Sequence, residues 1–292
     1  MKKLLILITA YNVENFIKKV IKRLPHEKLK KEFEYQILIL DDKSIDRTRD
    51  EIKKIKSEFQ DLDIKCLFNK VNQGYGGNQK IGYYYAVKLN FDYVVLLHGD
   101  GQYAPEKILD IMDPFKSSDV DAVQGSRMIK KTDALKGGMP IYKFIGNIGL
   151  TFIQNVLTNL SLSEFHSGYR AYRVKALSEI PFELNSNYFH FDTEIFIQLK
   201  IANKKIYEIP IPTFYGEEIS SLKSINYGLA ILKTTIKYYV QKFSIFYERK
   251  YDINNFKLTN LETQKKSSVY FSKLDFESTH SSCYSLIENN SK

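Results

Sequence analysis

The stretch Val94 to Glu106, VVLLHGDGQYAPE, constrains the fold more than any other part of the chain. An apolar run rich in β-branched residues ends abruptly in polar groups and glycine, and Pro105 then opens a new amphipathic segment. This order predicts a buried strand that delivers a loop and then a helix. Asp100 and Gln102 therefore fall at the carboxyl end of a central strand, which is the edge where open α/β sheets bind ligands.

This loop offers a possible metal site. Asp100 and Gln102 supply hard oxygen atoms two residues apart in an extended loop, so both side chains can face one cation. Mg²⁺ or Mn²⁺ suits such a site, because these ions keep several waters and take further ligands from substrate phosphates. The same Asp-Gly-Gln sequence is also compatible with a simple turn, and the pattern alone leaves both interpretations open.

Strands and helices alternate along the first part of the chain. Apolar runs at 4–8, 35–40 and 64–68 predict three more strands, and each is followed by a segment with helical periodicity. This alternation predicts an α/β fold with a mainly parallel central sheet flanked by helices. At 292 residues, 43% of them hydrophobic, the chain is long enough to bury such a core as one large domain with appendages.

Two of these strands are also followed by residues suited to a nucleotide. Asp41 and Asp42 could accept hydrogen bonds from ribose hydroxyls or a base edge. The glycine cluster that ends at Gly77 lets backbone amides approach phosphates at a helix start, with Lys80 one turn further on, although such glycines also form ordinary turns. The spacing matches neither the Walker loop nor the dinucleotide fingerprint, so the pattern supports neither an ATPase nor a dehydrogenase.

Charge and cysteine content narrow the class of protein. The net charge of +9 favours an anionic partner such as a nucleotide or a phospholipid. Nucleic-acid binding is disfavoured, because the lysines are scattered among acidic residues and no recognised binding motif accompanies them. Cys66 and Cys283 are too few for a disulfide framework, which indicates a reducing compartment.

Five motifs in order resemble the family 2 glycosyltransferases. They are TAYNVEN at 9–15, LDDKSIDRT at 40–48, NQGYGGNQKIG at 72–82, HGDGQYAPE at 98–106 and HSGYRAYR at 166–173. The branch that the chain resembles most is the polyprenyl (dolichyl) phosphate sugar synthases, over about residues 3–220. The resemblance implies the GT-A fold, a nucleoside-diphosphate sugar donor, bound Mg²⁺ or Mn²⁺, and inverting transfer of one sugar. It favours a polyprenyl phosphate acceptor at the cytoplasmic face of the cell membrane.

The same resemblance implies roles for individual residues. The residues implied for the nucleoside are Tyr11, Glu14, Asp41 and Asp42, and those implied for the phosphates are Lys80 and Arg127. Asp100 and Gln102 are implied for the metal, and Arg170 is implied for the acceptor. As a fork of fixed donors, an arginine near the acceptor would match the oxygens of a phosphate.

Three positions depart from the family pattern. His98 replaces the first carboxylate of the metal motif, and we interpret it as a hydrogen-bonding contact rather than a ligand. Glu164 stands where the synthases usually have Asp. The Arg and Lys commonly found near the end of the catalytic region are replaced in FYGEEISSLK at 214–223.

The acceptor class stays open at this point. A hydroxyl acceptor would need a general base such as Glu164, Asp192 or Glu194, whereas a phosphate acceptor is already ionised near neutral pH. Transfer to a hydroxyl of a glycan or glycolipid is therefore one alternative. A catalytically weakened nucleotide-sugar binding module is another, because His98 stands in the metal motif.

The chain divides into a GT-A domain at 1–220, with a nucleotide-sugar half at 1–128 and an acceptor half at 129–220, and two further segments. Apolar residues at helical spacing between Ile141 and Leu160 predict an amphipathic helix that packs on the sheet or on a dimer partner. A basic amphipathic helix at 221–250 fits a membrane surface or a core-covering role. The composition of 251–292 predicts a disordered tail.

Overall fold

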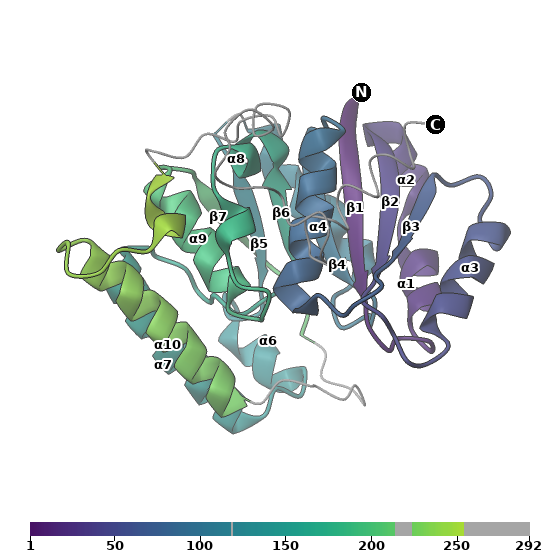
Figure 1. The fold of residues 1–292 in the computed structure, drawn as a ribbon. Helices are drawn as coiled ribbons and strands as arrows, with labels where there is room; N and C mark the ends of the chain where they lie inside the picture. The colour runs from purple at the N-terminus through teal and green to yellow at the C-terminus, as the bar shows by residue number, and fades with distance from the viewer. Residues whose placement is uncertain (118, 214–223, 254–292) are drawn as a thin grey trace, which may run out of the picture.

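The computed structural model describes residues 1–117, 119–213 and 224–253, and a seven-stranded sheet forms its centre (Figure 1). The strand order is β3-β2-β1-β4-β6-β5-β7. The strands are β1 (Lys2–Ala10), β2 (Phe33–Asp41), β3 (Ile64–Phe68), β4 (Tyr93–His98), β5 (Ala122–Ser126), β6 (Arg170–Arg173) and β7 (Ile206–Pro210).

The sheet is parallel except at one strand. β1 pairs in parallel with both β2 and β4, so that Ile6 lies between Ile37 and Val95. β6 runs antiparallel to β4 and to β5, and β7 is again parallel to β5. The prediction of an α/β fold with a mainly parallel sheet is confirmed.

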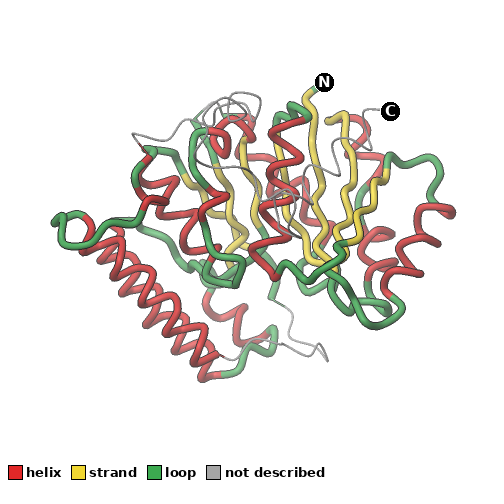
Figure 2. Tube along the Cα trace, viewed as in Figure 1, coloured by secondary structure: helices red, strands yellow, loops and turns green. Residues whose placement is uncertain are grey.

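Helices cover both faces of the sheet (Figure 2). On one face lie α1 (Ile17–Arg23), α2 (His26–Glu32), α3 (Thr48–Glu58) and α5 (Ile108–Met112); on the other lie α4 (Gly74–Lys88), α8 (Val174–Ser178) and α9 (Phe191–Ile201). The remaining α-helices are α6 (Lys131–Lys136), α7 (Ile141–Thr158) and α10 (Ser224–Gln241), and the short 3₁₀ turns are η1 (Pro105–Lys107), η2 (Asp113–Lys116), η3 (Phe182–Leu184) and η4 (Arg249–Tyr251).

Side chains alternate between the two faces of each strand, and this alternation divides the hydrophobic core into two layers. In β1, Leu4, Ile6 and Ile8 pack under α1 and α3, while Leu5 and Leu7 pack under α4. All five side chains are fully buried, as expected for a parallel strand with helices on both sides. This explains why the strand reads as a continuous apolar run.

The carboxyl ends of β1, β2, β3 and β4 meet at one edge of the sheet. Because β6 is antiparallel, the segment that precedes it, from Glu164 to Arg170, reaches the same edge. The order of strands thus gathers motifs that lie far apart in the sequence, from LDDKSIDRT to HSGYRAYR.

The helix pair α7 and α10 lies apart from the two layers (Figure 1). The predicted amphipathic helix between Ile141 and Leu160 is present, but its apolar stripe is exposed and does not pack on the sheet. The exposed members are Ile141, Ile145, Ile148, Phe152 and Val156.

Some predictions fall outside the described residues, namely those on 214–223 and most of those on 251–292. Within 1–117, 119–213 and 224–253, no helix combines the length and the apolar content that crossing a membrane requires.

Candidate functional site

Asp42, just after β2, orders the start of α4. Its carboxylate accepts hydrogen bonds from Asn69 Nδ2 at 2.9 Å, from the Gln73 backbone N–H at 2.7 Å and from the Gly74 backbone N–H at 2.9 Å. Burial raises the pKa of the Asp42 carboxyl, although these three hydrogen bonds act in the opposite direction. Asp42 therefore satisfies the first amides of α4, and its expected contact with a nucleoside stays a prediction.

The glycine cluster at the start of α4 contacts the loop at 185–188. The backbone N–H groups of Gly76 and Gly77 both donate to the Asn187 carbonyl, at 2.8 and 3.3 Å. A Cβ at Gly74 would lie 2.6 Å from that same oxygen, and one at Gly76 would lie 2.4 Å from the Ser186 carbonyl. The glycines thus allow the 185–188 loop to approach α4 closely, and the expected role of Gly77 at a phosphate stays a prediction.

Lys80 also contacts the 185–188 loop. Its buried ammonium donates to the Asn185 carbonyl and, at 2.7 Å, to Asn187 Oδ1. A buried ammonium is costly unless it is hydrogen-bonded, and the loop supplies these bonds. The structure therefore gives Lys80 a loop-anchoring position, in contrast to the expected phosphate contact.

Asp41, the last residue of β2, differs from its neighbour. Ser44 N donates to Oδ1 at 3.3 Å, whereas Oδ2 is buried without a hydrogen bond, with Arg49 Nε 3.8 Å away. Buried polar atoms are nearly always hydrogen-bonded, so this oxygen is suited to a donor group on a ligand. Nearby Tyr11 is exposed, and Glu14 accepts from Arg47 N at 2.8 Å, which braces this loop.

The loop after β4 holds the predicted metal residues. The Gln102 backbone N–H donates to Asp100 Oδ1 at 3.0 Å, and no described residue donates to Oδ2. His98 packs edge-on against Tyr75 and Tyr103, with ring centroids 5.5 and 4.9 Å apart, and its Nε2 lies 3.3 Å from the Tyr75 hydroxyl. Burial lowers the pKa of His98, so the imidazole is held neutral here. His98 thus has a hydrogen-bonding contact, as interpreted from the sequence.

Tyr75 links the metal loop to α9, a connection that the sequence analysis missed. Its hydroxyl donates to Asp192 Oδ2 at 2.9 Å, and Gln79 Nε2 donates to Asp192 Oδ1 at 3.2 Å. Burial raises the pKa of Tyr75 well above its ordinary value, so the phenol stays a donor. Its place among the glycines of α4 gave no signal of a role, because the partner residue lies 117 positions away.

Arg170 is fully buried, which differs from the expected fork open to an acceptor phosphate. Its Nε, Nη1 and Nη2 atoms donate to the carbonyls of Ser167, Asp192 and Phe165, at 2.9, 2.7 and 2.7 Å. The guanidinium also lies 4.0 Å from the ring centroid of Phe196. Arg170 thus holds the loop before β6 and the start of α9 in position through hydrogen bonds to their carbonyl groups.

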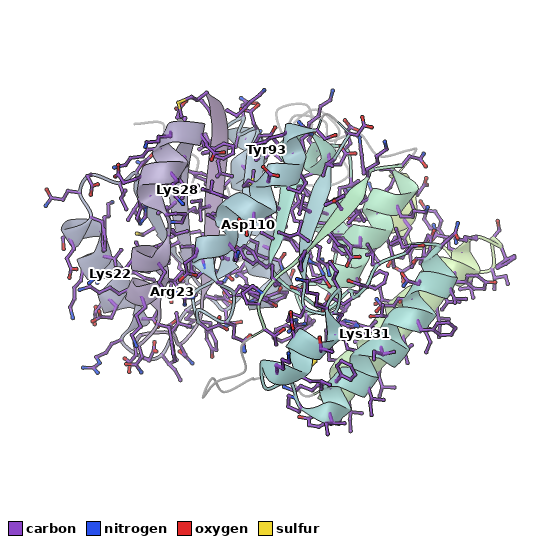
Figure 3. All side chains as sticks on the ribbon, turned by 180° about the vertical axis from the view of Figure 1, so that it is seen from behind. Lys22, Arg23, Lys28, Tyr93, Asp110 and Lys131 are labelled. Atoms are coloured by element: carbon purple, nitrogen blue, oxygen red, sulfur yellow. The ribbon has the colours of Figure 1, made fainter. Side chains whose placement is uncertain are left out.

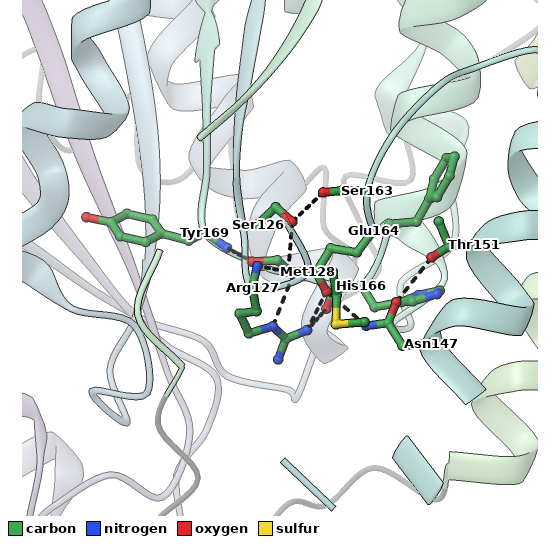
Figure 4. Close-up of polar contacts among 12 residues, drawn as sticks. Ser126, Arg127, Met128, Asn147, Thr151, Ser163, Glu164, His166 and Tyr169 are labelled. Atoms are coloured by element: carbon green, nitrogen blue, oxygen red, sulfur yellow. Dashed lines mark hydrogen bonds and ion pairs between the residues drawn. The ribbon is translucent and has the colours of Figure 1, made fainter. Parts of the chain in front are cut away.

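Glu164 and Arg127 form a buried ion pair at the same edge (Figure 4). Arg127 Nη2 lies 2.9 Å from Glu164 Oε2, its backbone N–H donates to Oε1 at 2.5 Å, and Asn147 Nδ2 donates to Oε2 at 3.0 Å. Burial alone would raise the pKa of Glu164, but the charge and hydrogen bonds of Arg127 outweigh it and lower that pKa. Glu164 is thus an ionised, fully paired carboxylate.

Comparison with known proteins identifies the family of this chain. The model of the family described as Glycosyl transferase family 2 matches residues 5–181. The match begins within β1, extends past β6 and contains every motif of the edge described above. The chain belongs to glycosyl transferase family 2. It is therefore a glycosyltransferase, as the motifs had implied.

Two relatives of this family 2 enzyme carry specific names. The UDP-N-acetylglucosamine–dolichyl-phosphate N-acetylglucosaminyltransferase of Methanococcus voltae is 30% identical over 226 residues, which cover 74% of this chain and 87% of that protein. The undecaprenyl-phosphate mannosyltransferase of Micrococcus luteus is 26% identical over 196 residues, which cover 65% of this chain and 76% of that protein. Both names belong to the polyprenyl-phosphate sugar branch that the motifs resemble.

A solved structure confirms the GT-A fold. Glucosyl-3-phosphoglycerate synthase from Mycobacterium tuberculosis, in complex with Mn²⁺, UDP and phosphoglyceric acid, matches with a TM-score of 0.55 at 13% identity. The match covers 85% of this chain and 80% of that one. Such a low identity shows the fold alone.

The residues present fit a divalent cation that completes its shell from a substrate. Among the described residues, no three His, Cys, Asp or Glu side chains gather as a metal cage. Asp100 nevertheless keeps one carboxylate oxygen without a described hydrogen-bond donor, while its other oxygen accepts from the Gln102 backbone N–H. Mg²⁺ is commonly held by one or two carboxylates plus phosphates, and this donor set matches that pattern.

Proposed function

We propose that this enzyme moves one sugar from a nucleoside-diphosphate sugar to a polyprenyl-phosphate-type acceptor. The reaction is metal-dependent and inverting, and the enzyme acts as a peripheral protein at the cytoplasmic face of the membrane. The names of the two relatives support this acceptor class, because both include a polyprenyl phosphate.

The hydrogen bonds and ion pairs of the candidate bases support a phosphate acceptor. Glu164 is fully buried and paired with Arg127, and Asp192 is buried with both oxygens accepting hydrogen bonds. A hydroxyl nucleophile needs a base within hydrogen-bond reach, whereas a phosphate monoester is already ionised. Because the oxygens of these two candidate bases are occupied by the protein, the site suits the second kind of acceptor.

On the donor side, Asp41 Oδ2 and exposed Tyr11 would contact the nucleoside, and Asp100 with Gln102 would hold Mg²⁺ or Mn²⁺. A bound cation supplies stabilisation of the negative charge on the leaving diphosphate. Arg127, whose guanidinium lies at the same edge, is the phosphate contact that the geometry favours. The acceptor oxygen forms the new bond to the anomeric carbon from the face opposite the leaving diphosphate, and this inverts the configuration.

A transfer assay tests the proposal. The enzyme is incubated with labelled UDP-, GDP- and dTDP-sugars, a divalent cation, and either a polyprenyl phosphate or the matching polyprenol. We expect a labelled lipid product from the phosphate only, with inverted anomeric configuration by NMR. Transfer only to the alcohol or to a glycan would overturn the acceptor assignment.

Variants test the metal assignment in the same assay. Asp100→Asn should lower turnover by about a hundredfold, which corresponds to about 3 kcal/mol of lost transition-state stabilisation. His98→Ala should lower turnover less. Asp110→Asn is the matched control, because Asp110 lies on α5 with its carboxylate exposed and paired with Lys107 of η1. Full turnover of Asp100→Asn in excess chelator would show that the reaction does not need the cation there.

A further inference from the structure

His166, on the loop before β6, uses one ring nitrogen and leaves the other without a partner. Its Nδ1 lies 3.1 Å from the hydroxyl of Tyr227 on α10. Its Nε2 is buried, yet no described residue forms a hydrogen bond with it. Buried polar atoms in folded proteins are nearly always hydrogen-bonded, so an unpaired one calls for a specific explanation.

The contact with Tyr227 determines where the imidazole carries its proton. Burial raises the pKa of the Tyr227 phenol far above its ordinary value of 10, so the hydroxyl keeps its proton and donates to Nδ1. Burial lowers the pKa of His166 to about 4, so the ring is neutral near pH 7. A neutral imidazole that accepts at Nδ1 carries its proton on Nε2. We therefore assign the unpaired nitrogen as an N–H donor.

His26 shows the same kind of contact in a purely structural setting. Its Nδ1 lies 2.9 Å from the hydroxyl of Tyr35, and its Nε2 lies 2.8 Å from the carbonyl oxygen of Ile21. His26 opens α2 near the start of β2, at the edge of the sheet opposite the catalytic one. There both ring nitrogens are satisfied within the protein. A structural role accounts for the Tyr227 contact of His166, but it leaves the Nε2 proton without an acceptor.

His166 lies at the catalytic edge, close to charged groups. Arg127 Nη2 donates to its carbonyl oxygen at 3.2 Å (Figure 4), and the charges of Glu164, Arg127 and Arg170 act on its ring. The two carboxylate oxygens of Glu164 already accept hydrogen bonds from Arg127 and Asn147. The Nε2 proton is therefore available to an acceptor on a bound ligand.

Ring contacts connect His166 to the loop after β4. Tyr227 packs edge-on against Phe189, with ring centroids 6.5 Å apart, and Phe189 stacks on Tyr75 at 4.9 Å. Tyr75 in turn packs against the ring of His98, which begins the loop assigned to the metal. The row of rings holds His166 in place relative to the proposed diphosphate site. A neutral N–H donor there suits a phosphate, because the oxygens of an ionised phosphate accept hydrogen bonds.

We infer that the Nε2–H group of His166 donates a hydrogen bond to a phosphate oxygen of a substrate, and that Tyr227 holds the ring in the form that can donate. His166 is then a substrate contact, and Tyr227 is a positioning residue that acts through it. The inference rests on the proposed function for the presence of phosphate at this edge. That phosphate can belong to the nucleoside diphosphate of the donor or to the lipid acceptor, and separate binding measurements distinguish the two sources.

Titration calorimetry tests the contact without catalysis. The probes are UDP, GDP and dTDP with Mg²⁺, and a short, water-soluble isoprenyl phosphate with its alcohol as the reference. In His166→Asn the amide reaches only about as far as Nδ1, whereas in His166→Gln it reaches about as far as Nε2. His166→Asn should weaken binding of a phosphate probe at least about tenfold, because hydrogen bonds to charged groups are the stronger ones. His166→Gln should restore most of that affinity.

The two variants separate this contact from a structural role, for which Asn would be the better replacement because it keeps a group at the Nδ1 position. A loss limited to the nucleoside diphosphates would assign the phosphate to the donor. A loss limited to the isoprenyl phosphate would assign it to the acceptor. Tyr227→Phe should weaken the same probe by a smaller factor, since the imidazole loses the hydrogen bond that orients it.

Two controls match these changes. His26→Asn removes the histidine with the same kind of tyrosine contact, and Tyr238→Phe changes a buried tyrosine of α10 that packs against Tyr251. Both should bind every probe like the unchanged chain, and circular dichroism should show whether each variant is folded. Where His166→Asn does not fold, Tyr227→Phe decides, and its unchanged affinity for every phosphate probe would then overturn the inference.

Three results with folded proteins would also overturn it. They are unchanged affinity of His166→Asn for every phosphate probe, equal losses in His166→Asn and His166→Gln, and no binding of any phosphate probe by the unchanged chain. A failed transfer assay, together with phosphate binding that depends on His166, would count against the proposed function alone.

Discussion

The Glu164–Arg127 pair gives the sharpest test of how the site is built. Glu164→Gln keeps the size of the side chain but removes its charge, which takes away the buried carboxylate that pairs with the largely buried guanidinium of Arg127. Breaking a buried pair in this way costs about 3–5 kcal/mol, and we take the lower end because the amide oxygen still accepts one hydrogen bond. For a chain of this size, a loss of about 3 kcal/mol lowers the Tm by about 6–12 °C.

The sign of the pH dependence follows from the direction of the pKa shift. Because the folded state lowers the pKa of Glu164 below its ordinary value of 4.5, its ionised form stabilises the fold at all pH values above that. This stabilisation is lost as the pH falls from 4.5 through the lower pKa of the folded state. The difference in Tm between Glu164→Gln and the unchanged chain should therefore be full at pH 7 and shrink in acid.

Differential scanning calorimetry from pH 7 downward measures this difference. Glu106→Gln is the control, because Glu106 makes the same two-pronged contact with Arg23, at 2.6 and 3.0 Å, but both side chains are about half exposed. Arg23 lies on the outer surface (Figure 3), and an exposed pair contributes about 0–1 kcal/mol. Adding Arg127→Leu to Glu164→Gln should cost less than the sum of the two single changes. A Glu164→Gln protein that melts like the unchanged chain but transfers no sugar would refute this reasoning and make Glu164 a base.

Two further predictions concern the donor side and α4. Asp41→Asn should weaken UDP or GDP binding by about tenfold or more in titration calorimetry, because a hydrogen bond to a charged group is worth about 1.5–3 kcal/mol; unchanged affinity would remove Asp41 from the nucleoside site. Gly76→Ala should destabilise the fold by about 1–3 kcal/mol in urea, because the new Cβ would lie 2.4 Å from the Ser186 carbonyl. Gly146→Ala on α7, where no atom lies within 4 Å of the new Cβ, should instead be neutral or stabilising by about 1 kcal/mol.

The sheet could be predicted from the sequence because its pattern is local. A strand buried on both faces needs a continuous apolar run, and the runs at 4–8, 35–40 and 64–68 all lie within observed strands. The polar loop after β4 was placed correctly for the same reason, since the apolar run ends where the strand ends. Its metal site stays a prediction. The single antiparallel strand β6 was not predicted, because strand direction depends on pairing between distant segments.

The glycine motif shows a limit of local patterns, and its expected role at a phosphate stays a prediction. Glycine signals close approach, but the sequence does not say what approaches, and a phosphate and the 185–188 loop demand the same missing Cβ. The same limit applies to Arg170, whose carbonyl partners lie before β6 and at the start of α9. The inverted burial of α7 was hidden because periodicity gives the stripe but not the side on which the core lies.

Hydrogen-bond satisfaction separates the motif residues that support the site from those left to meet a ligand. A buried charge is costly unless it is paired, so Asp42, Glu164 and Arg170 hold neighbouring loops in place with contacts that are already made. Asp41 and Asp100 stand at the same edge, yet each keeps one carboxylate oxygen without a described hydrogen-bond donor. These two oxygens lie at the ends of β2 and β4, the two strands that flank β1. They are the positions at which the proposed function places a nucleoside and the metal of its diphosphate.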